Sequence, residues 1–368
     1  MKIATVLGTR PEIIRLSRIV AKLDNRGGHV LIHTGQNFDR ALSDVFFDEM
    51  GIRAPDHFLA VRGETPASQI GQILERCERI FLDQRPDRLL ILGDTNSALC
   101  AIVAKRMGIP VFHMEAGNRC YDDRVPEEVN RRLIDHSSDI LMPYTERSRA
   151  NLLREGIAGE RVYVIGNPIL EVIEYHRDRI DSSDILDRME LKPDGYFLVT
   201  LHRAENVDVA SRLNAFIDAL SRLSQRHRLP VIVSTHPRTA HRMKQFGVGG
   251  STGDVRFPNP FGFFDFIKLE KSARCVLSDS GTVQEECAIF RVPNATLRDV
   301  TERPETLERG SNILTGADQD QIIDCVETVL ALPPAWDPPP EYMVRNVSDT
   351  VVRLVAGFHL NLGRGPMA

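Results

Sequence analysis

Short apolar runs rich in β-branched residues alternate along the chain with longer segments whose apolar residues recur every three or four positions. The short runs predict buried strands, and the longer segments predict amphipathic helices. This alternation is typical of βαβ units, so we predict an α/β protein with parallel sheets. The expected strands are Ile3–Leu7, Val30–His33, Leu89–Leu92, Val111–Met114, Ile140–Met142, Val162–Ile165, Phe197–Thr200, Val231–Ser234, Val255–Phe257, Cys275–Leu277 and Ala295–Leu297.

The strands fall into two series, which predicts two Rossmann-like domains. A chain of 368 residues exceeds one ordinary core. The break is expected near Gly166-Asn167-Pro168, giving domains at 1–167 and 168–340. A proline-rich linker begins at Pro333, and a final helix is expected from Glu341 to Phe358, within a C-terminal segment 341–368.

Polar motifs stand at the predicted carboxyl ends of the strands, where open α/β sheets bind ligands. Two such sheets facing each other predict one cleft between the domains. The motifs are Gly8-Thr9-Arg10-Pro11-Glu12, Thr34-Gly35-Gln36-Asn37, Gly93-Asp94-Thr95-Asn96, His113-Met114-Glu115-Ala116-Gly117, Leu201-His202-Arg203, Thr235-His236-Pro237-Arg238, Ser278-Asp279-Ser280-Gly281-Thr282 and Arg298-Asp299.

Composition narrows the class of protein. A net charge of −5 argues against a nucleic-acid or membrane-surface protein, because both need a concentrated basic face. The six cysteines show no zinc spacing and are expected to be reduced thiols. A strand is expected from residue 3, which leaves no room for a signal peptide, and no apolar run is long enough to span a membrane. A cytoplasmic protein is therefore expected.

Two strand-to-helix turns could hold a diphosphate on free backbone N–H groups. Thr9 with Glu12 is typical of a capping box, and Thr282 with Glu285 has the same spacing. An ordinary helix cap explains either turn alone about equally well. Arg10 favours the anion site, because a cation in the first turn opposes the helix dipole. Neither turn has the glycine pattern of a dinucleotide site.

Three carboxylates and a histidine are the candidates for proton transfer. Asp94 and Glu115 directly follow apolar strands, and Glu127 follows in Pro126-Glu127-Glu128. A cap or salt bridge explains any single one of them better, but three at neighbouring strand ends favour acid–base chemistry. His202 is expected to approach from the second domain, while His236 and Arg238 are weaker candidates.

Five motifs carry a family resemblance. The chain resembles the non-hydrolysing UDP-N-acetylglucosamine 2-epimerases over essentially its whole length. The residues that carry the resemblance, in order and spacing, are Gly8-Thr9-Arg10-Pro11-Glu12, Gly93-Asp94-Thr95, His113-Met114-Glu115-Ala116-Gly117, Pro126-Glu127-Glu128-Val129-Asn130-Arg131 and Asp279-Ser280-Gly281 with Glu285-Glu286.

The resemblance implies a GT-B architecture whose C-terminal helix returns to the first domain, a homodimer, a UDP-activated N-acetylamino sugar as substrate, and no metal or redox cofactor. It assigns catalysis to Asp94, Glu115, Glu127 and His202. It implies that Glu286 binds the ribose hydroxyls and that Gln36 lies near the sugar and diphosphate. The full set expected to bind substrate or UDP is Arg10, Arg15, Gln36, Arg131, His236, Arg238, Phe264, Ser280, Gly281, Thr282, Glu286 and Arg303.

Several positions depart from the commoner members of the family. Arg15 replaces a lysine, Leu201 and Thr282 replace glycines, and Asn118-Arg119-Cys120 replaces Leu-Arg-Thr. With Pro260-Phe261-Gly262-Phe263-Phe264-Asp265 and Ser234-Thr235-His236-Pro237-Arg238, these resemble the branch that converts UDP-2-acetamido-2,6-dideoxy-L-talose to UDP-N-acetyl-L-fucosamine. The alternatives to a non-hydrolysing epimerase are a hydrolysing epimerase, a GT-B glycosyltransferase and a non-catalytic nucleotide-sugar sensor, since fold alone does not separate them.

Overall fold

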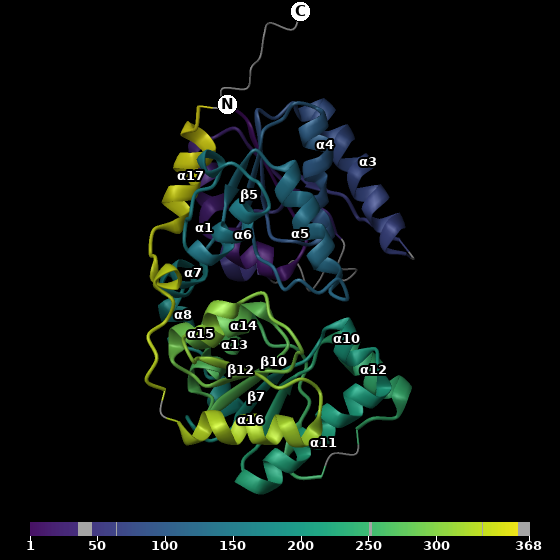
Figure 1. The fold of residues 1–368 in the computed structure, drawn as a ribbon, viewed down its shortest axis with the longest axis vertical. Helices are drawn as coiled ribbons and strands as arrows, with labels where there is room; N and C mark the ends of the chain where they lie inside the picture. The colour runs from purple at the N-terminus through teal and green to yellow at the C-terminus, as the bar shows by residue number, and fades with distance from the viewer. Residues whose placement is uncertain (36–45, 64, 250–251, 333, 360–368) are drawn as a thin grey trace, which may run out of the picture. The chain divides into compact units, whose positions relative to one another are not determined.

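The computed structural model describes residues 1–35, 46–63, 65–249, 252–332 and 334–359. It divides into two units (Figure 1). The first contains Met1–Gly117, Val129–Glu171 and the residues from Val344 onward, and the second contains Asn118–Glu128 and Val172–Met343. The chain therefore contributes to the second unit twice, and helices α5 and α7 each begin in that division of the chain that the other end leaves.

The first unit is built on a parallel sheet in the order β3-β2-β1-β4-β5-β6. This is the Rossmann order, in which the direction of winding reverses between β1 and β4. Its strands are β1 (Ile3–Leu7), β2 (His29–His33), β3 (His57–Phe58), β4 (Arg88–Leu92), β5 (Val111–Met114) and β6 (Ile140–Met142). Its helices are α1 (Arg10–Arg26), α3 (Pro66–Gln84), η1 (Asn96–Leu99), α4 (Cys100–Arg106), α5 (Pro126–Ser137), α6 (Glu146–Arg154), η2 (Gly159–Arg161), α7 (Ile169–Tyr175) and α17 (Val347–Gly357).

Alternate residues of these strands bury opposite faces of the sheet. Ala4 and Val6 of β1 pack with Ile73 of α3 and Ala101 of α4 in one apolar cluster. Figure 1 shows α3 and α4 on that side of the sheet and α1 with α17 on the other. Burial on both faces explains why the strands are nearly continuous apolar runs.

The second unit repeats the same plan, with the order β12-β11-β10-β7-β8-β9 and a reversal between β7 and β10. Its strands are β7 (Phe197–Thr200), β8 (Val231–Ser234), β9 (Val255–Arg256), β10 (Cys275–Ser278), β11 (Asn294–Thr296) and β12 (Asn312–Leu314). Its helices are α8 (Arg177–Asp181), α9 (Ile185–Arg188), α10 (Ala204–Val207), α11 (Ala210–His227), α12 (Pro237–Phe246), α13 (Phe263–Ser272), α14 (Gly281–Phe290), α15 (Pro304–Glu308), α16 (Gln319–Ala331) and η3 (Pro340–Met343).

Two apolar clusters fill the two faces of the second sheet. Phe197 and Val199 of β7 pack with Phe216 of α11 and Ile322 of α16. Leu198, between them in the strand, packs instead in the cluster that contains Phe266 of α13. The sheet is therefore the middle of three layers, and its ends carry the loops that hold the polar motifs.

The predicted parallel-sheet fold is confirmed, with three local corrections. The strand expected at Val162–Ile165 is wrong, because only Val162 forms a β-bridge, with Leu141. The sequence did not predict β3 or β12, which are short edge strands with little apolar pattern. The final helix begins at Val347 rather than Glu341, after the 3₁₀ turn η3. No helix in the described part of the chain has the length and apolar character needed to cross a bilayer.

Helix α17 belongs to the first unit and packs against α1. A carboxylate from α7 satisfies the start of α17, because Ser348 donates its backbone N–H to Glu171 Oε2 at 2.9 Å and its hydroxyl to Glu171 Oε1. Lys22 of α1 joins this cluster, with its Nζ 2.6 Å from Ser348 Oγ and 2.8 Å from Asp349 Oδ1. A negative group at a helix N-terminus is stabilising. Glu171 therefore helps to dock α17.

Replacing Glu171 with alanine should loosen α17, because the orphan N–H of Ser348 loses its acceptor. A lost cap costs about 1–2 kcal/mol, so amide hydrogen exchange across α17 should accelerate about 5- to 30-fold. The control is Glu75→Ala, which removes an exposed pair with Arg79 and should leave exchange in α17 unchanged. Equal exchange in the wild type and Glu171→Ala would show that apolar packing alone holds the helix.

Candidate functional site

The first candidate site lies where β1 and β4 end side by side, at the reversal of the first sheet. Glu12, in the first turn of α1, ties these two ends together. Its Oε2 accepts the N–H of Gly8 at 2.9 Å, and the N–H and hydroxyl of Thr9, each at 2.7 Å. Its Oε1 accepts the hydroxyl of Thr95, from the loop after β4, at 3.0 Å. The predicted capping box of Thr9 and Glu12 is confirmed, and it also reaches a second strand end.

Burial raises the pKa of Glu12 to about 7, against the hydrogen bonds from Thr9, Gly8 and Thr95 that favour the ionised form. The carboxyl group is 2% exposed and sits where a helix N-terminus favours negative charge. A buried carboxyl group that changes charge near neutral pH therefore joins the two loops.

Asp94, directly after β4, is held by two residues of α5. Its Oδ2 accepts Nε of Arg131 at 2.8 Å and lies 2.8 Å from Nη2 of the same side chain. Asn130 donates from Nδ2 to the backbone oxygen of Asp94 at 3.0 Å. Arg131 is 3% exposed. The residue expected to hold UDP therefore orients the candidate proton carrier within this unit.

Glu115, directly after β5, pairs with Arg15 of α1. Arg15 Nη1 donates to Glu115 Oε2 at 2.7 Å, and the Arg15 and Glu115 side chains are 2% and 9% exposed. The backbone of Glu115 is left-handed, with φ 65°, a conformation that costs a non-glycine residue about 1 kcal/mol or more. Such strain is kept where the surrounding structure fixes it, and it is common at functional sites.

His113 links the ends of β4 and β5, a role that sequence reasoning missed. Its Nε2 is 2.8 Å from the carbonyl oxygen of Gly93, and its Nδ1 is 2.9 Å from Asp135 Oδ1. Asp135 Oδ2 also accepts the N–H of Gly117 at 3.1 Å. The position of His113 in the motif before Glu115 was the available signal, but its buried partner on α5 was not visible in the chain order.

Arg10 follows Thr9 in the first turn of α1, as predicted, and its guanidinium lies 4.4 Å from the ring centre of Phe46. Gln36, predicted to lie near the sugar and diphosphate, falls outside the described residues.

The second candidate site lies where β7 and β10 end side by side, at the reversal of the second sheet. His202 follows β7, and its Nδ1 lies 3.0 Å from Oδ1 of Asp279, which follows β10. Asp279 also accepts the N–H of Arg203 at 2.9 Å. Sequence reasoning placed Asp279 in a motif but gave it no role. The His236 ring lies 5.8 Å from that of His202, centre to centre.

Glu127 and Arg203 meet within the second unit. Arg203 Nη1 lies 3.8 Å from Glu127 Oε2 and 3.9 Å from Glu205 Oε1, and Nη2 lies 3.4 Å from Glu302 Oε1. Nearby acidic groups raise the pKa of Arg203, although burial opposes this. The Glu127 side chain is 38% exposed, so it is the most accessible of the three candidate carboxylates.

The predicted cap of the α14 turn is wrong. The helix begins at Gly281 with Ser280 as its N-cap, so Thr282 lies inside the first turn and its hydroxyl is 3.0 Å from Ser280 Oγ. Glu285 does not close a capping box, because Arg303 takes its carboxylate in a fully buried ion pair. Gly281 stands where an added Cβ would come within 2.7 Å of Glu302 Oε1. The backbone thus approaches this turn closely, which suits a phosphate-binding loop.

The other predicted binding residues are spread over the second unit. Glu286 is 5% exposed. Arg238 is exposed and pairs with Asp208, with Nε 3.1 Å from Oδ1. Phe264 lies under the guanidinium of Arg179, 4.1 Å from ring centre to Cζ. These contacts bring Phe264 and Arg238 to neighbours other than His202.

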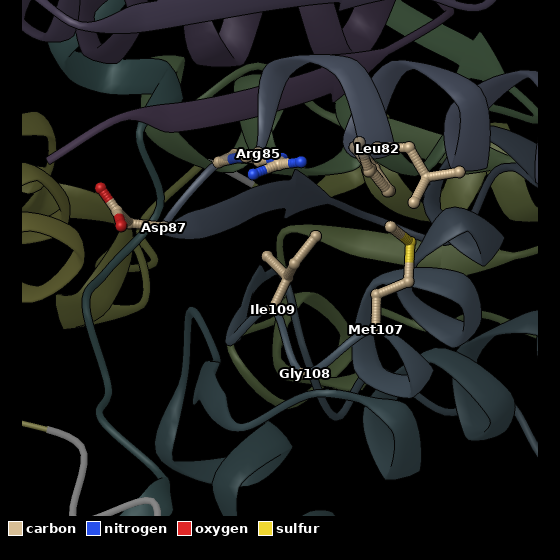
Figure 2. A pocket seen from close by; sticks show the side chains of 8 residues that line it. Leu82, Arg85, Asp87, Met107, Gly108 and Ile109 are labelled. Carbon is tan, nitrogen blue, oxygen red and sulfur yellow. The ribbon is translucent and has the colours of Figure 1, made fainter. Parts of the chain in front are cut away.

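A pocket of about 290 Å³ lies at the opposite edge of the first sheet (Figure 2). It is lined by the residues that precede β4 and β5, among them Arg85, Asp87 and Ile109, together with Leu82 of α3. None of the predicted site residues lines it, and it lies at the amino ends of the strands, where this fold does not place its ligands.

Comparison with known proteins gives consistent matches. Residues 21–356 match the family model described as UDP-N-acetylglucosamine 2-epimerase. The UDP-N-acetylglucosamine 2-epimerase of Methanocaldococcus jannaschii is 39% identical over 348 residues, covering 92% of this chain and 95% of the relative. The UDP-2,3-diacetamido-2,3-dideoxy-D-glucuronate 2-epimerase of Pseudomonas aeruginosa is 36% identical over 335 residues, with 90% and 92% covered.

Solved structures agree with these matches. The crystal structure of the Methanocaldococcus jannaschii enzyme in complex with UDP-GlcNAc and UDP has a TM-score of 0.91 at 38% identity, covering 96% of this chain and 99% of that one. A glycosyltransferase involved in lipopolysaccharide biosynthesis has a TM-score of 0.59 at 14% identity, a likeness of fold alone. The predicted fold class, two Rossmann-like domains of the GT-B type, is confirmed, while the cleft between them stays a prediction.

Glu12→Gln should change how stability depends on pH. Because folding raises the pKa of Glu12 from 4.5 to about 7, its contribution is fully present below pH 4.5 and is lost as the pH rises to about 7. The loss amounts to roughly 3 kcal/mol. Glutamine keeps one acceptor for Thr9 and does not titrate, so the variant should gain on the wild type across this window. Urea unfolding at several pH values measures the difference.

The control for this experiment is Glu78→Gln, an exposed change on α3. Its stability should follow the wild-type curve at every pH. Parallel curves for Glu12→Gln and the wild type would mean that Glu12 is ionised throughout the range.

Proposed function

Because the chain belongs to the UDP-N-acetylglucosamine 2-epimerase family, we propose that it inverts C2 of a UDP-activated N-acetylamino sugar without net hydrolysis. The observation that carries the proposal is the pair of carboxylates at adjacent strand ends, Asp94 after β4 and Glu115 after β5, each oriented by a buried arginine. The structure matched above binds UDP-GlcNAc and UDP, which supports a UDP-sugar as the substrate here.

The proposed chemistry follows from the substrate. The C2 hydrogen is not acidic, because no carbonyl or imine is adjacent to it, so direct proton removal is too costly. Breaking the bond from C1 to the UDP oxygen, with the electron pair leaving on UDP, develops positive charge at C1. A carboxylate then takes the C2 proton, and a C1–C2 double bond forms as a 2-acetamidoglycal. A proton added to the opposite face of C2 and re-addition of the UDP oxygen to C1 complete the inversion.

The scheme needs proton carriers for two faces of the sugar and donors for the departing diphosphate. We assign proton transfer to Asp94, Glu115, Glu127 and His202. Arg10 and the two helix N-termini, of α1 and α14, supply positive potential for the diphosphate. The remaining binding set proposed from the sequence is Arg15, Gln36, Arg131, His236, Arg238, Phe264, Ser280, Gly281, Thr282, Glu286 and Arg303.

Support for these roles differs among the residues. Asp94 and Glu115 have oriented carboxylates beside the reversal of the first sheet, where ligands bind in this fold. The Gly281 backbone is closely approached, as a phosphate turn requires. Arg15, Arg131 and Arg303 each make a buried ion pair with a carboxylate, which favours a part in orienting those groups.

For the sugar itself, we propose UDP-2-acetamido-2,6-dideoxy-L-talose, converted to UDP-N-acetyl-L-fucosamine. The support is sequence resemblance at the departures from the commoner pattern, among them Arg15, Leu201 and Thr282. The curated relatives act on differing sugars, which include UDP-N-acetylglucosamine and a diacetamido glucuronate. UDP-N-acetylglucosamine is therefore the second candidate.

Solvent deuterium should enter C2 of the sugar when the enzyme turns over in deuterated buffer with no acceptor present. Asp94→Asn and Glu115→Gln should each lower turnover by at least a hundredfold, because loss of a proton carrier costs about 10²–10⁴ in rate. Their affinity for UDP should stay within a few fold of the wild type. Mass spectrometry of the sugar and calorimetry with UDP make the two measurements.

The matched control is Asp87→Asn, at the amino end of the strand that Asp94 follows. It should keep turnover within twofold. Turnover within about tenfold of the wild type in Asp94→Asn would remove that residue from the proton-transfer set. Release of free sugar would indicate a hydrolysing epimerase, and UDP binding without any exchange would indicate a sensor.

The choice of sugar is tested by offering the two UDP-sugars separately in deuterated buffer. The L-talo sugar should be epimerised with kcat/KM at least tenfold higher than UDP-N-acetylglucosamine. Equal or reversed values would contradict the proposed branch while leaving the epimerase chemistry in place.

A further inference from the structure

We infer that Asp279 is a positioning residue that fixes the tautomer of His202, with the proton on Nδ1 and Nε2 left for proton exchange. This inference rests on the proposed function, in which His202 exchanges a proton with the substrate. It adds a residue that the sequence motifs did not single out.

The contacts of Asp279 are those of a residue that orients the loop after β7. Asp279 is fully buried. Its Oδ2 accepts the backbone N–H of His202 at 3.0 Å and of Arg203 at 2.9 Å, and Nδ2 of Asn206 at 3.2 Å. These donors fix the carboxylate from one side. The loop of His202 is thereby attached to the end of β10.

The second oxygen meets the imidazole. Asp279 Oδ1 lies 3.0 Å from Nδ1 of His202 and 3.2 Å from its backbone N–H. The His202 side chain is 40% exposed, while the Asp279 side chain is fully buried. The contact therefore anchors one nitrogen of an otherwise accessible ring.

Asp279 is ionised, which decides where the proton lies. Burial alone would raise the pKa of Asp279, but the adjacent His202 and Arg203 and their hydrogen bonds hold it well below its usual range. An ionised carboxylate only accepts hydrogen bonds. Nδ1 of His202 must therefore be the donor, and Nε2 is the nitrogen that a neutral ring keeps free of hydrogen.

The same arrangement serves proton transfer in other active sites, where a buried aspartate sets the tautomer of a histidine and stabilises its protonated form. His202 is suited to this role because its ring is accessible and its other neighbours do not compete for Nδ1. The His236 ring approaches it at 5.8 Å between centres, too far for a direct hydrogen bond through Nδ1 already held by Asp279.

Asp279→Asn tests the inference, because it keeps the shape of the side chain. The amide oxygen can still accept from His202 N, Arg203 N and Asn206, so the NH₂ group faces Nδ1 of the ring. Nδ1 must then accept, and the proton moves to Nε2. We expect ¹⁵N NMR, at a pH where the two nitrogens share one proton, to show Nδ1–H in the wild type and Nε2–H in Asp279→Asn.

Kinetics gives the second readout. A wrong tautomer lowers turnover without weakening binding, so kcat in Asp279→Asn should fall at least a hundredfold while KM stays within threefold. The double variant Asp279→Asn/His202→Ala should be no slower than His202→Ala, since Asp279 acts through the ring. The control Asn206→Ala removes a neighbouring contact to Asp279 and should keep the Nδ1–H tautomer.

Two results would overturn the inference: an Nε2–H tautomer in the wild type, or an unchanged tautomer in Asp279→Asn. A further loss of turnover on the His202→Ala background would overturn it as well, by showing that Asp279 acts on the loop. The wild-type spectrum alone decides the tautomer if Asp279→Asn does not fold. Full turnover in His202→Ala would instead count against the proposed role of His202, and the NMR result separates that failure from failure of the tautomer assignment.

Discussion

A buried carboxylate joins two strand ends at the reversal point of each sheet, and the candidate sites depend on these two links. Parallel pairing brings β1 beside β4 and β7 beside β10, but it forms no bond between the loops that follow them. Glu12 supplies that bond in the first unit through Thr9 and Thr95, and Asp279 supplies it in the second through His202 and Arg203. Without such links, the loops after neighbouring strands would be free to separate, and the side chains they carry would lose their mutual geometry.

Buried ion pairs then orient the side chains that these loops present. Arg15 with Glu115 and Arg303 with Glu285 are almost fully buried, and such pairs gain little stability because desolvation offsets their attraction. Their value to an enzyme lies in direction, since a guanidinium fixes a carboxylate in its plane. The left-handed backbone of Glu115 agrees with this interpretation, because it spends conformational energy on the placement of one side chain. The site is thus a costly part of an otherwise well-packed unit.

The sequence predicted the strands and the motifs that follow them, because both are local. Apolar runs set β1, β5, β6, β7 and β8 to their observed bounds, and each motif follows from its strand. Contacts between distant residues were beyond it. Nothing in the chain order joins His113 to Asp135, or His202 to Asp279, because these pairs form only when strands and helices pack. Short-range competition also escaped the pattern: Ser280 caps α14 in place of Thr282, since Arg303 occupies the carboxylate that a capping box would use.

The chemistry at the two reversal points does not by itself select a sugar. Elimination needs a UDP oxygen at C1, a hydrogen at C2 and donors for the departing diphosphate, and these are common to every N-acetylamino UDP-sugar. The relatives named above act on sugars that differ at C3 and C6, yet they match this chain over its length with similar identity. Residues such as Asp94, Glu115 and Gly281 are therefore expected to be shared in kind among enzymes of differing substrate. Selection must fall to side chains that meet the distal carbons of the ring, where a missing or added polar group leaves a buried partner unsatisfied. For this reason the family follows from the shared motifs, whereas the sugar is decided by positions outside them.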